Sequence, residues 1–300
     1  MTAGDCDVIV VGGGPAGLSA ALMLGRCRRR VIVVDAGEPR NRRAGAVHGY
    51  LGREGISPLE LLRVGREELT PYGVEFIHGE AVDASRTPEG GFEVELRSGA
   101  RLRSRFILLA TGVVDQLPEI PGFSEFYGTS VHHCPYCDGW ESRDLPIAVY
   151  GNSGAGLALS LKTWSDEIVL CTGGPHTLSA ERLRQLNRAS IRVIDLEIAR
   201  LEGSGGQLER IVFRNGETLP RRKVFFSSHP FQRSRLAEKL GCRFNEKGTV
   251  RTDIRQGAGV SGVWVAGDAA KDVQSVIVAA AEGAKAGIAI NMALQKLERG

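Results

Sequence analysis

Two cysteines separated by two residues carry the strongest chemical signal in this sequence. Cys134 and Cys137 lie in the run HHCPYCDG at positions 132–139. Two intervening residues allow a strained disulfide that exchanges readily, and a helix start or a nearby positive charge lowers a thiol pKa so that a thiolate forms near neutral pH. The other cysteines, at positions 6, 27, 171 and 242, are isolated, so the pair indicates redox catalysis or metal binding rather than a disulfide framework.

A zinc site is the alternative interpretation of the pair. Zinc usually takes a second pair of ligands, but Cys171 and Cys242 are isolated, and two adjacent histidines cannot be assumed to be ligands. We therefore expect no metal site and interpret the pair as a redox dithiol.

Polar residues beside the cysteines could move a proton. Asp138 directly follows the pair and could carry a proton to or from a departing thiolate if burial raises its pKa. The same residue type is well suited to capping a helix N-terminus, and both roles can coexist. Either His132 or His133 could stabilise a thiolate, although adjacent histidines also occur in ordinary polar loops. We take Asp138 and His133 as catalytic candidates alongside the two cysteines.

A β-α-β unit opens the chain. The apolar strand 8–11 runs into the glycine-rich turn 12–17, and a helical run follows over 18–24. A second apolar strand, 31–34, then ends at Asp35. Such a crossover is right-handed and builds a parallel sheet.

The turn has the spacing of a dinucleotide-binding motif. Gly12 permits the tight turn, Gly14 lets a pyrophosphate approach the backbone, and Gly17 lets the helix pack on the strand. Asp35 stands about twenty residues further on, where a carboxylate accepts the hydroxyls of a ribose. In this context the turn predicts dinucleotide binding rather than a purely structural glycine turn.

A second copy of this plan begins at strand 147–150, which leads into the turn 151–156 and a helix near 157–164. The middle glycine of the motif is replaced by Ser153, whose side chain would crowd a pyrophosphate. The next strand ends in the run LCTGG at 170–174, without an acid for the ribose of NAD or an arginine for the phosphate of NADP. Nicotinamide binding and a vestigial scaffold both remain open.

The second copy is expected to interrupt the first. The apolar strand within 263–268 ends in Gly-Asp and has its counterpart in the first fold. We therefore predict one domain from 1–117 and 242–300, with 118–241 inserted. The alanine-rich segment 276–297 is expected to be helical.

The amino-acid composition limits the kinds of partner that we expect this protein to bind. The 300 residues are 42% hydrophobic and 24% charged with a net charge of +3, which is typical of an ordinary globular protein. A sustained basic face is missing, so we expect no nucleic acid; the arginines within 40–43 could instead touch a cofactor phosphate. No uninterrupted apolar stretch of about 18 residues occurs. Met1 to Asp7 leads into a strand without a signal-peptide pattern. We expect no membrane partner and a cytoplasmic location.

These motifs together resemble the low-molecular-weight thioredoxin reductases and their relatives among the flavin disulfide oxidoreductases. The resemblance implies an α/β fold of two Rossmann-like, three-layer ββα-type nucleotide-binding domains, with the second inserted into the first. It also implies bound FAD and a homodimer. The residues that carry it are Gly12-Gly13-Gly14-Pro15-Ala16-Gly17, Ala110-Thr111-Gly112, Cys134-Pro135-Tyr136-Cys137-Asp138-Gly139, the second turn at 151–156, and Gly267-Asp268.

The resemblance also assigns roles. Asp268 is expected to bond the ribityl chain of FAD, and the segment 274–276 to lie along the flavin. Cys137 would face the flavin, Cys134 would exchange with the substrate sulfur, and Asp138 would be the acid. The FAD-binding residues expected from the motif and the resemblance are Gly12, Gly14, Pro15, Ala16, Gly17, Asp35, Ala110, Thr111, Gly112, Gly267, Asp268, Gln274, Ser275 and Val276.

Departures from the family pattern concern the electron donor. Thioredoxin reductases usually carry a His-Arg-Arg stretch for NADPH where this chain has Cys171-Thr172-Gly173, so the use of NAD(P)H is uncertain. The Pro-Tyr spacer and the run 139–141 resemble the gliotoxin- and holomycin-type dithiol oxidases and the pyridine-nucleotide-independent thioredoxin reductases. Those oxidases typically have a histidine directly after the cysteine pair. This chain has Asp138 at that position, which resembles the pattern of the reductases.

The expected partner is a thioredoxin-like protein or a small-molecule dithiol or disulfide. The leading hypothesis is a thioredoxin-reductase-like enzyme that exchanges electrons between FAD and that partner through Cys134 and Cys137. The alternative enzyme is an oxidase that forms a disulfide in a small dithiol and passes the electrons to oxygen. A flavoprotein redox sensor, in which the cysteines switch conformation without turnover, is the hypothesis from a different class.

Overall fold

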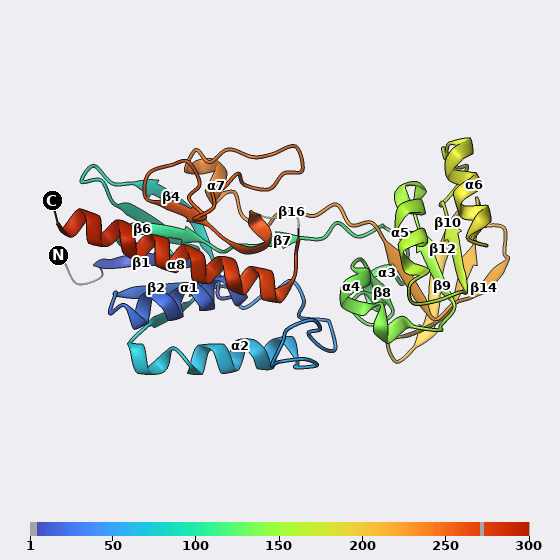
Figure 1. The fold of residues 1–300 in the computed structure, drawn as a ribbon, viewed down its shortest axis with the longest axis horizontal. Helices are drawn as coiled ribbons and strands as arrows, with labels where there is room; N and C mark the ends of the chain where they lie inside the picture. The colour runs from blue at the N-terminus through green and yellow to red at the C-terminus, as the bar shows by residue number, and fades with distance from the viewer. Residues whose placement is uncertain (1–4, 271–272, 300) are drawn as a thin grey trace. The chain divides into compact units, whose positions relative to one another are not determined.

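The computed structural model describes residues 5–270 and 273–299, and the predicted N-terminal run from Met1 begins outside them. The chain folds into two compact units (Figure 1). The first unit comprises the described parts of 1–42, 50–114 and 230–300, and the second comprises 43–49 and 115–229.

The first unit is built on one sheet in the order β3-β2-β1-β6-β5-β4, with β17 also paired to β6. Strands β1, β2, β3, β6 and β17 are parallel, and the apolar residues of the central strands β1, β2 and β6 are mostly buried on both faces of the sheet, whereas Phe76 of the edge strand β3 is exposed. β4, β5 and β6 form an antiparallel meander. The strands of this unit are β1 (Asp5–Val11), β2 (Val31–Asp35), β3 (Glu75–His78), β4 (Ala81–Arg86), β5 (Phe92–Leu96), β6 (Arg101–Leu109), β7 (Val113–Val114), β16 (Phe231–Gln232) and β17 (Val263–Val265).

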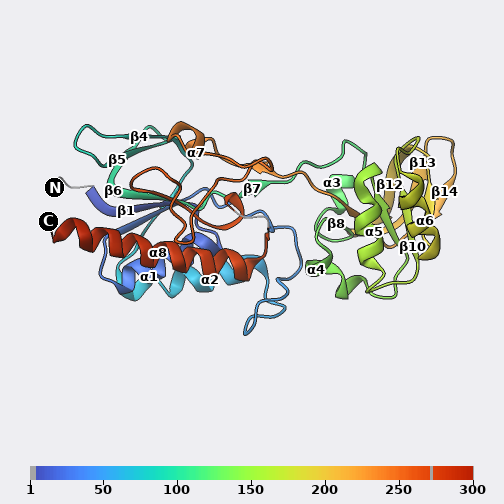
Figure 2. The ribbon, with the colours of Figure 1, turned by 45° about the horizontal axis from the view of Figure 1, so that its top comes forward.

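Helices cover one face of this sheet, and α8 lies along α1 (Figure 2). The two helices touch at the backbone, because a Cβ added at Gly283 would lie 1.9 Å from the Ala16 carbonyl oxygen. By length and composition alone α8 would pass as a membrane-spanning helix, but this packing makes it a core helix of the unit. The helices are α1 (Pro15–Arg26), α2 (Pro58–Glu67), α7 (Leu236–Lys239) and α8 (Val276–Glu298), with short 3-10 turns η1 (Thr70–Tyr72) and η4 (Gly267–Ala269).

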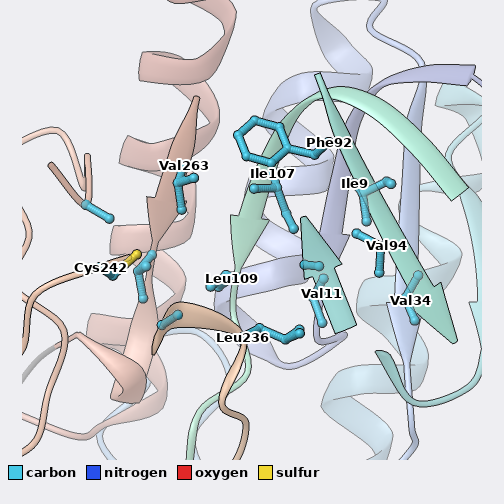
Figure 3. Close-up of a cluster of buried hydrophobic side chains, with 14 of the residues drawn as sticks. Ile9, Val11, Val34, Phe92, Val94, Ile107, Leu109, Leu236, Cys242 and Val263 are labelled. Carbon is cyan, nitrogen blue, oxygen red and sulfur yellow. The ribbon is translucent and has the colours of Figure 1, made fainter. Parts of the chain in front are cut away.

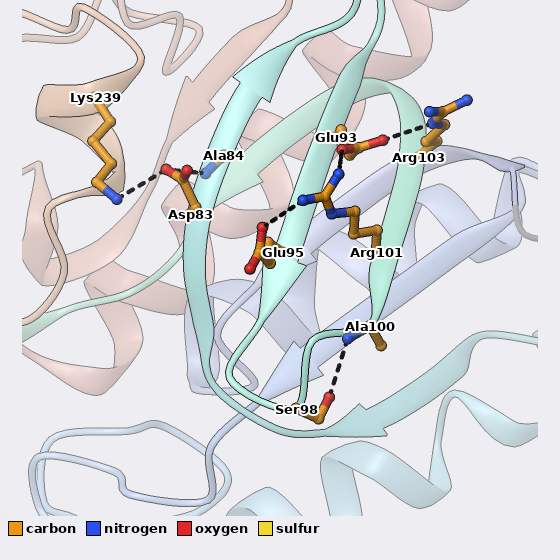
Figure 4. A network of polar contacts seen from close by, with 9 residues as sticks. All are labelled: Asp83, Ala84, Glu93, Glu95, Ser98, Ala100, Arg101, Arg103 and Lys239. Carbon is orange, nitrogen blue, oxygen red and sulfur yellow. Dashed lines mark hydrogen bonds and ion pairs between the residues drawn. The ribbon is translucent and has the colours of Figure 1, made fainter.

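The opposite face of the sheet packs against the chain that returns from the second unit. Leu236 of α7 and Cys242 are buried in one cluster with Phe92 and Ile107 (Figure 3). Lys239 of α7 also donates to a carboxylate oxygen of Asp83 over 2.9 Å (Figure 4). These contacts place α7 in the first unit.

The two compact units differ from the predicted domain limits at both junctions. The first unit resumes at 230 rather than 242, because β16 pairs with β7 and α7 enters the hydrophobic core. The second unit begins at 115 rather than 118, and it also includes 43–49. Arg43 joins it because its guanidinium donates to the Ser124 carbonyl over 2.5 Å.

The second unit repeats the layered plan. Its parallel sheet has the order β11-β10-β9-β15-β8; α5 and α6 pack on one face, and an antiparallel sheet β12-β13-β14 packs on the other. The predicted α/β class with two nucleotide-binding folds is confirmed. The strands are β8 (Val131–His132), β9 (Ile147–Tyr150), β10 (Ile168–Cys171), β11 (Arg192–Ile194), β12 (Ile198–Ser204), β13 (Gln207–Phe213), β14 (Thr218–Pro220) and β15 (Lys223–Phe226), and the helices are α3 (Phe123–Phe126), α4 (Pro135–Asp138), η2 (Trp140–Ser142), η3 (Asn152–Gly154), α5 (Ala155–Leu161) and α6 (Ala180–Arg188).

Candidate active site

The first glycine turn is shaped by contacts that only glycine can make. Gly12 has a φ of +108°, and a Cβ there would lie 2.3 Å from the Ala110 carbonyl oxygen. A Cβ at Gly17 would lie 1.9 Å from the Gly12 carbonyl oxygen. At Gly14, by contrast, a Cβ would meet nothing within 4 Å. The outer glycines are thus required by packing, whereas the middle one leaves its backbone open to a ligand.

Anion-binding and ribose-binding groups adjoin this open backbone. α1 begins at Pro15, and no side chain caps its N-terminus at Gly14, so its first N–H groups can meet a phosphate. The Asp35 carboxylate at the end of β2 lies against the turn, because a Cβ at Gly13 would come within 2.8 Å of it. Asp35 is ion-paired with Arg66 of α2. These groups fit a dinucleotide.

Two further predicted cofactor residues are joined by an arginine. The Arg40 guanidinium donates to Asp268 Oδ2 over 2.9 Å and to Gln274 Oε1 over 2.6 Å. The neighbouring Gly267 N–H donates to the buried Glu282 carboxylate of α8 over 2.9 Å. The sequence left open that the arginines within 40–43 touch a cofactor phosphate; in the structure Arg40 contacts Asp268, the residue expected to bond the ribityl chain.

The remaining predicted FAD residues follow β6 or precede α8. Residues 110–112 leave β6 beside the first turn, since the Ala110 carbonyl faces Gly12. Ser275 is the N-cap of α8, which begins at Val276. The first unit therefore gathers the predicted FAD residues around the carboxyl ends of β1, β2, β6 and β17, where such folds bind ligands.

The cysteine pair lies in the second unit at the start of a helical turn. Cys134 and Cys137 form a disulfide with 5.3 Å between their Cα atoms. α4 begins at Pro135, and the Cys134 carbonyl accepts the N–H groups of Cys137 and Asp138, each over 3.2 Å. This short turn holds Asp138 beside the pair. In the described residues, no three His, Cys, Asp or Glu side chains gather as metal ligands.

A hydrogen-bonded chain leads away from Asp138. Its Oδ1 lies 3.1 Å from His132 Nδ1, and His132 Nε2 lies 3.2 Å from Lys223 Nζ. Lys223 also donates to the Thr129 carbonyl over 2.7 Å. His132 is only 5% exposed. Burial lowers the pKa of Lys223, while the charges of Asp138 and Glu141 oppose that shift.

The predicted catalytic residue His133 belongs to a different network. His133 Nδ1 lies 3.0 Å from the Tyr127 hydroxyl, which donates to Asp115 over 2.7 Å. The His132 ring lies beside Phe225, whereas the His133 ring lies beside Phe226 and Tyr127. His132 is the histidine that contacts Asp138. The sequence offered both candidates, and nothing in it pointed to Lys223, which is remote in the chain.

The second glycine turn differs from the first in its side-chain contacts. Asn152 Oδ1 accepts the Thr177 N–H over 3.0 Å, which ties the turn to the loop after β10. Ser153 occupies the middle position, where the first turn has a glycine. The Tyr150 ring lies against Gly173, 3.0 Å from where a Cβ would be.

The strand after each turn also ends differently. β2 ends in the carboxylate of Asp35, whereas β10 ends in the fully buried thiol of Cys171. Burial raises the pKa of Cys171 to about 12. A neutral buried thiol cannot accept ribose hydroxyls as a carboxylate does.

Comparison with known proteins assigns the family. The model of the family described as pyridine nucleotide-disulphide oxidoreductase matches residues 6–283. The chain belongs to this family. It is 30% identical over 299 residues to the thioredoxin reductase tcpT of Claviceps purpurea, and the match covers 95% of this chain and 93% of the relative.

Solved structures of family relatives agree with this assignment. The crystal structure of HlmI has a TM-score of 0.94 and 38% identity, and the match covers 99% of this chain and 94% of HlmI. An oxidoreductase from Agrobacterium tumefaciens has a TM-score of 0.90 and 34% identity, with 97% and 99% of the two chains covered. The predicted resemblance is confirmed: the chain is a flavin-dependent disulfide oxidoreductase of the thioredoxin reductase family with a redox-active Cys134–Cys137 pair. The family implies FAD as cofactor.

Proposed function

We propose that this enzyme moves two electrons between FAD and a dithiol or disulfide substrate through Cys134 and Cys137, without taking them from NAD(P)H. Bound FAD supplies a two-electron carrier for this exchange. The observation that supports the proposal is the closed second turn, in which Asn152 is bonded to Thr177 and Ser153 replaces a glycine.

That observation bears directly on nicotinamide binding. In such folds the pyrophosphate approaches the middle glycine of the turn, and the ribose meets the residue that ends the next strand. Here the middle position carries a Ser153 side chain, and the next strand ends in the buried Cys171. The hydrogen bond between Asn152 and Thr177 joins the two segments between which the nucleotide would lie.

FAD belongs to the first unit in this proposal. The open backbone at Gly14 and the start of α1 would meet the pyrophosphate, and Asp35 would meet the ribose. Arg40 would fix Asp268 and Gln274 for the remainder of the cofactor. Residues 110–112, Gly267, Ser275 and Val276 would complete the FAD site.

The proposed substrate is a thioredoxin-like protein or a small-molecule dithiol, and the proposed assembly is a cytoplasmic homodimer. The closed second turn also favours the alternative of a dithiol oxidase, because a dithiol then becomes the electron source. In that reaction a substrate dithiol becomes a disulfide, and its two electrons and two protons reduce oxygen to hydrogen peroxide. Peroxide released with a dithiol in air would identify the oxidase. Its absence, together with reduction of a protein disulfide when reduced ferredoxin supplies the two electrons, would identify the reductase.

The cysteines provide the test. Anaerobic dithiothreitol should bleach the flavin of the wild-type holoenzyme, whereas Cys137→Ser should retain FAD and lose this reaction by at least about 10³-fold. Cys27→Ser is the matched control, because Cys27 is an exposed thiol in the first unit. Rapid bleaching of the Cys137→Ser flavin would contradict the proposed route through the pair.

A further inference from the structure

A chain of three side chains stands behind the disulfide. Asp138 is bonded to His132, and His132 to Lys223, with separations of 3.1 and 3.2 Å. We propose that His132 and Lys223 are positioning residues that orient the Asp138 carboxylate and exchange protons with it during thiol–disulfide exchange. This inference rests on the proposed function, and it adds the residues that serve the proton of that reaction.

The direction of the chain follows from its donors and acceptors. A lysine ammonium can only donate hydrogen bonds, so His132 Nε2 must accept the one from Lys223. A neutral imidazole whose Nε2 accepts carries its proton on Nδ1. That proton points to Asp138 Oδ1, the partner of Nδ1. Lys223 therefore fixes the tautomer that presents a donor to the carboxylate.

The same geometry lets one proton move along the chain. A doubly protonated His132 has no acceptor nitrogen, so it can bond only a neutral Lys223. Transfer of a proton from Lys223 to His132 keeps both hydrogen bonds and places the added charge next to Asp138. Burial lowers the pKa of Lys223 and so favours this transfer.

The charged groups near Lys223 have opposing effects on its pKa. Asp138 and Glu141 favour its charged form, and Arg222 disfavours it. Glu141 also lies 3.5 Å from His48 Nε2. Thr129 contributes only a carbonyl acceptor. Burial and Arg222 therefore lower the pKa of Lys223, and the two carboxylates oppose that shift.

The chemistry that needs this proton is the first exchange step. The sulfur of a substrate thiol bonds to Cys134, the Cys134–Cys137 bond breaks, and its electron pair leaves on Cys137 as a thiolate. The substrate proton passes to the Asp138 carboxylate, which the His132 Nδ1–H holds in place through its other hydrogen-bonded oxygen. The second substrate thiol then displaces Cys134 from the mixed disulfide, which yields the substrate disulfide and the reduced pair. The reverse direction returns the proton to the departing substrate thiolate.

A pH profile of the exchange step tests the proposal. Reduction of the pair by dithiothreitol in the holoenzyme is followed by the flavin absorbance in wild type and in Lys223→Met. At pH 6 to 7 the variant should be slower by about ten- to a hundredfold, because dithiol protons must be removed there. Above the ordinary thiol pKa of about 8.5, where solution supplies thiolate, the two rates should converge.

Two variants separate this role from a structural one. His132→Asn can donate to Asp138 but cannot pass a proton, so it should also slow the step only below the thiol pKa. Lys162→Met is the matched control, since it makes the same substitution at a lysine of the second unit that pairs only with Asp166 among the contacts described, and it should follow the wild-type profile. Unchanged Lys223→Met rates, or an equal loss at every pH, would overturn the proposal.

A spectroscopic measurement keeps the inference testable apart from turnover. ¹⁵N chemical shifts of labelled histidine should assign the Nδ1–H tautomer to His132 in wild type and lose that preference in Lys223→Met. An Nε2–H tautomer in wild type would overturn the proposal. If the wild-type protein undergoes no exchange with dithiols at any pH, the proposed function fails. The His132 tautomer still shows whether the hydrogen-bonded series Asp138–His132–Lys223 exists.

Discussion

The two glycine turns of this molecule share a strand–turn–helix plan but differ in what their backbones face. In the first, a Cβ at Gly17 would collide with the Gly12 carbonyl, and the middle position at Gly14 is open. In the second, a Cβ at Gly156 meets nothing within 4 Å, and Ser153 fills the middle position. A nucleotide-binding fold can thus keep its architecture while the contacts around its glycine turn change.

The largest expected difference is between alanine substitutions at the last glycine of each turn, in FAD binding and in stability. Gly17→Ala should abolish FAD binding and destabilise the first unit, because its Cβ would lie 1.9 Å from the Gly12 carbonyl oxygen. Gly156→Ala should leave FAD bound and stabilise α5 by up to about 1 kcal/mol, since alanine is the better helix former. FAD per chain and the thermal midpoint measure both. Normal FAD content in Gly17→Ala would contradict the role of the first turn.

The next effect concerns the arginine on the cofactor side of the first unit. Arg40→Met removes the donor that holds Asp268 and Gln274, so we expect FAD to bind roughly tenfold more weakly, in line with one charged hydrogen bond. Titration of apoprotein with FAD, followed by flavin fluorescence, measures the change. Arg42→Met is the control, because Arg42 pairs only with the exposed Glu38 among the contacts described. Equal losses in both variants would remove Arg40 from the site.

A smaller effect is expected from loss of the hydrogen bond between Asn152 and Thr177 at the second turn. Asn152→Ala removes the bond to the Thr177 N–H, and we expect a loss of about 0.5–1 kcal/mol from the free energy of unfolding of the second unit. FAD content should stay unchanged. NADPH should still fail to reduce the flavin, because the strand still ends in Cys171 rather than in a ribose-binding acid. Gain of NADPH reduction in this variant would show that the tie alone excludes the nucleotide.

A further effect is a pH dependence at the end of β10. Burial raises the pKa of Cys171 to about 12, so its thiol stays neutral in the folded protein while the unfolded thiol ionises near pH 8.5. Its contribution to stability is complete below pH 8.5 and is lost as the pH rises toward 12. Denaturation curves from pH 8 to 11 should therefore fall less steeply for Cys171→Val than for wild type. Identical slopes would contradict the buried neutral thiol.

Much of the fold was predictable from local patterns. The nucleotide-binding plan of the first unit was predictable, because its signals lie close together in sequence. They are the apolar strands, the glycine spacing and Asp35. The second domain limit was placed at 241, because nothing local marks α7 as part of the first core. Leu236 joins that core only through contacts with strands far earlier in the chain.

The candidate site was predictable in its chemistry but not in its connections. The spacing of Cys134 and Cys137 identified the redox pair, but the choice between His132 and His133 depended on their partners in the folded protein, Asp138 for His132 and Tyr127 for His133. Lys223 reaches His132 only because β15 pairs with β8 in the folded sheet. Contacts of this kind depend on tertiary structure and leave no short-range signal in a single sequence.

The most direct test of the central claim, that the second nucleotide fold no longer supplies electrons, is anaerobic addition of NADPH, then NADH, then dithiothreitol to the holoenzyme while the flavin absorbance is followed. We predict no bleaching with either nicotinamide and prompt bleaching with the dithiol, which would assign the electrons to thiol–disulfide exchange at Cys134 and Cys137. Prompt bleaching by NADPH or NADH would contradict the account, because the second turn would then bind nicotinamide despite Ser153.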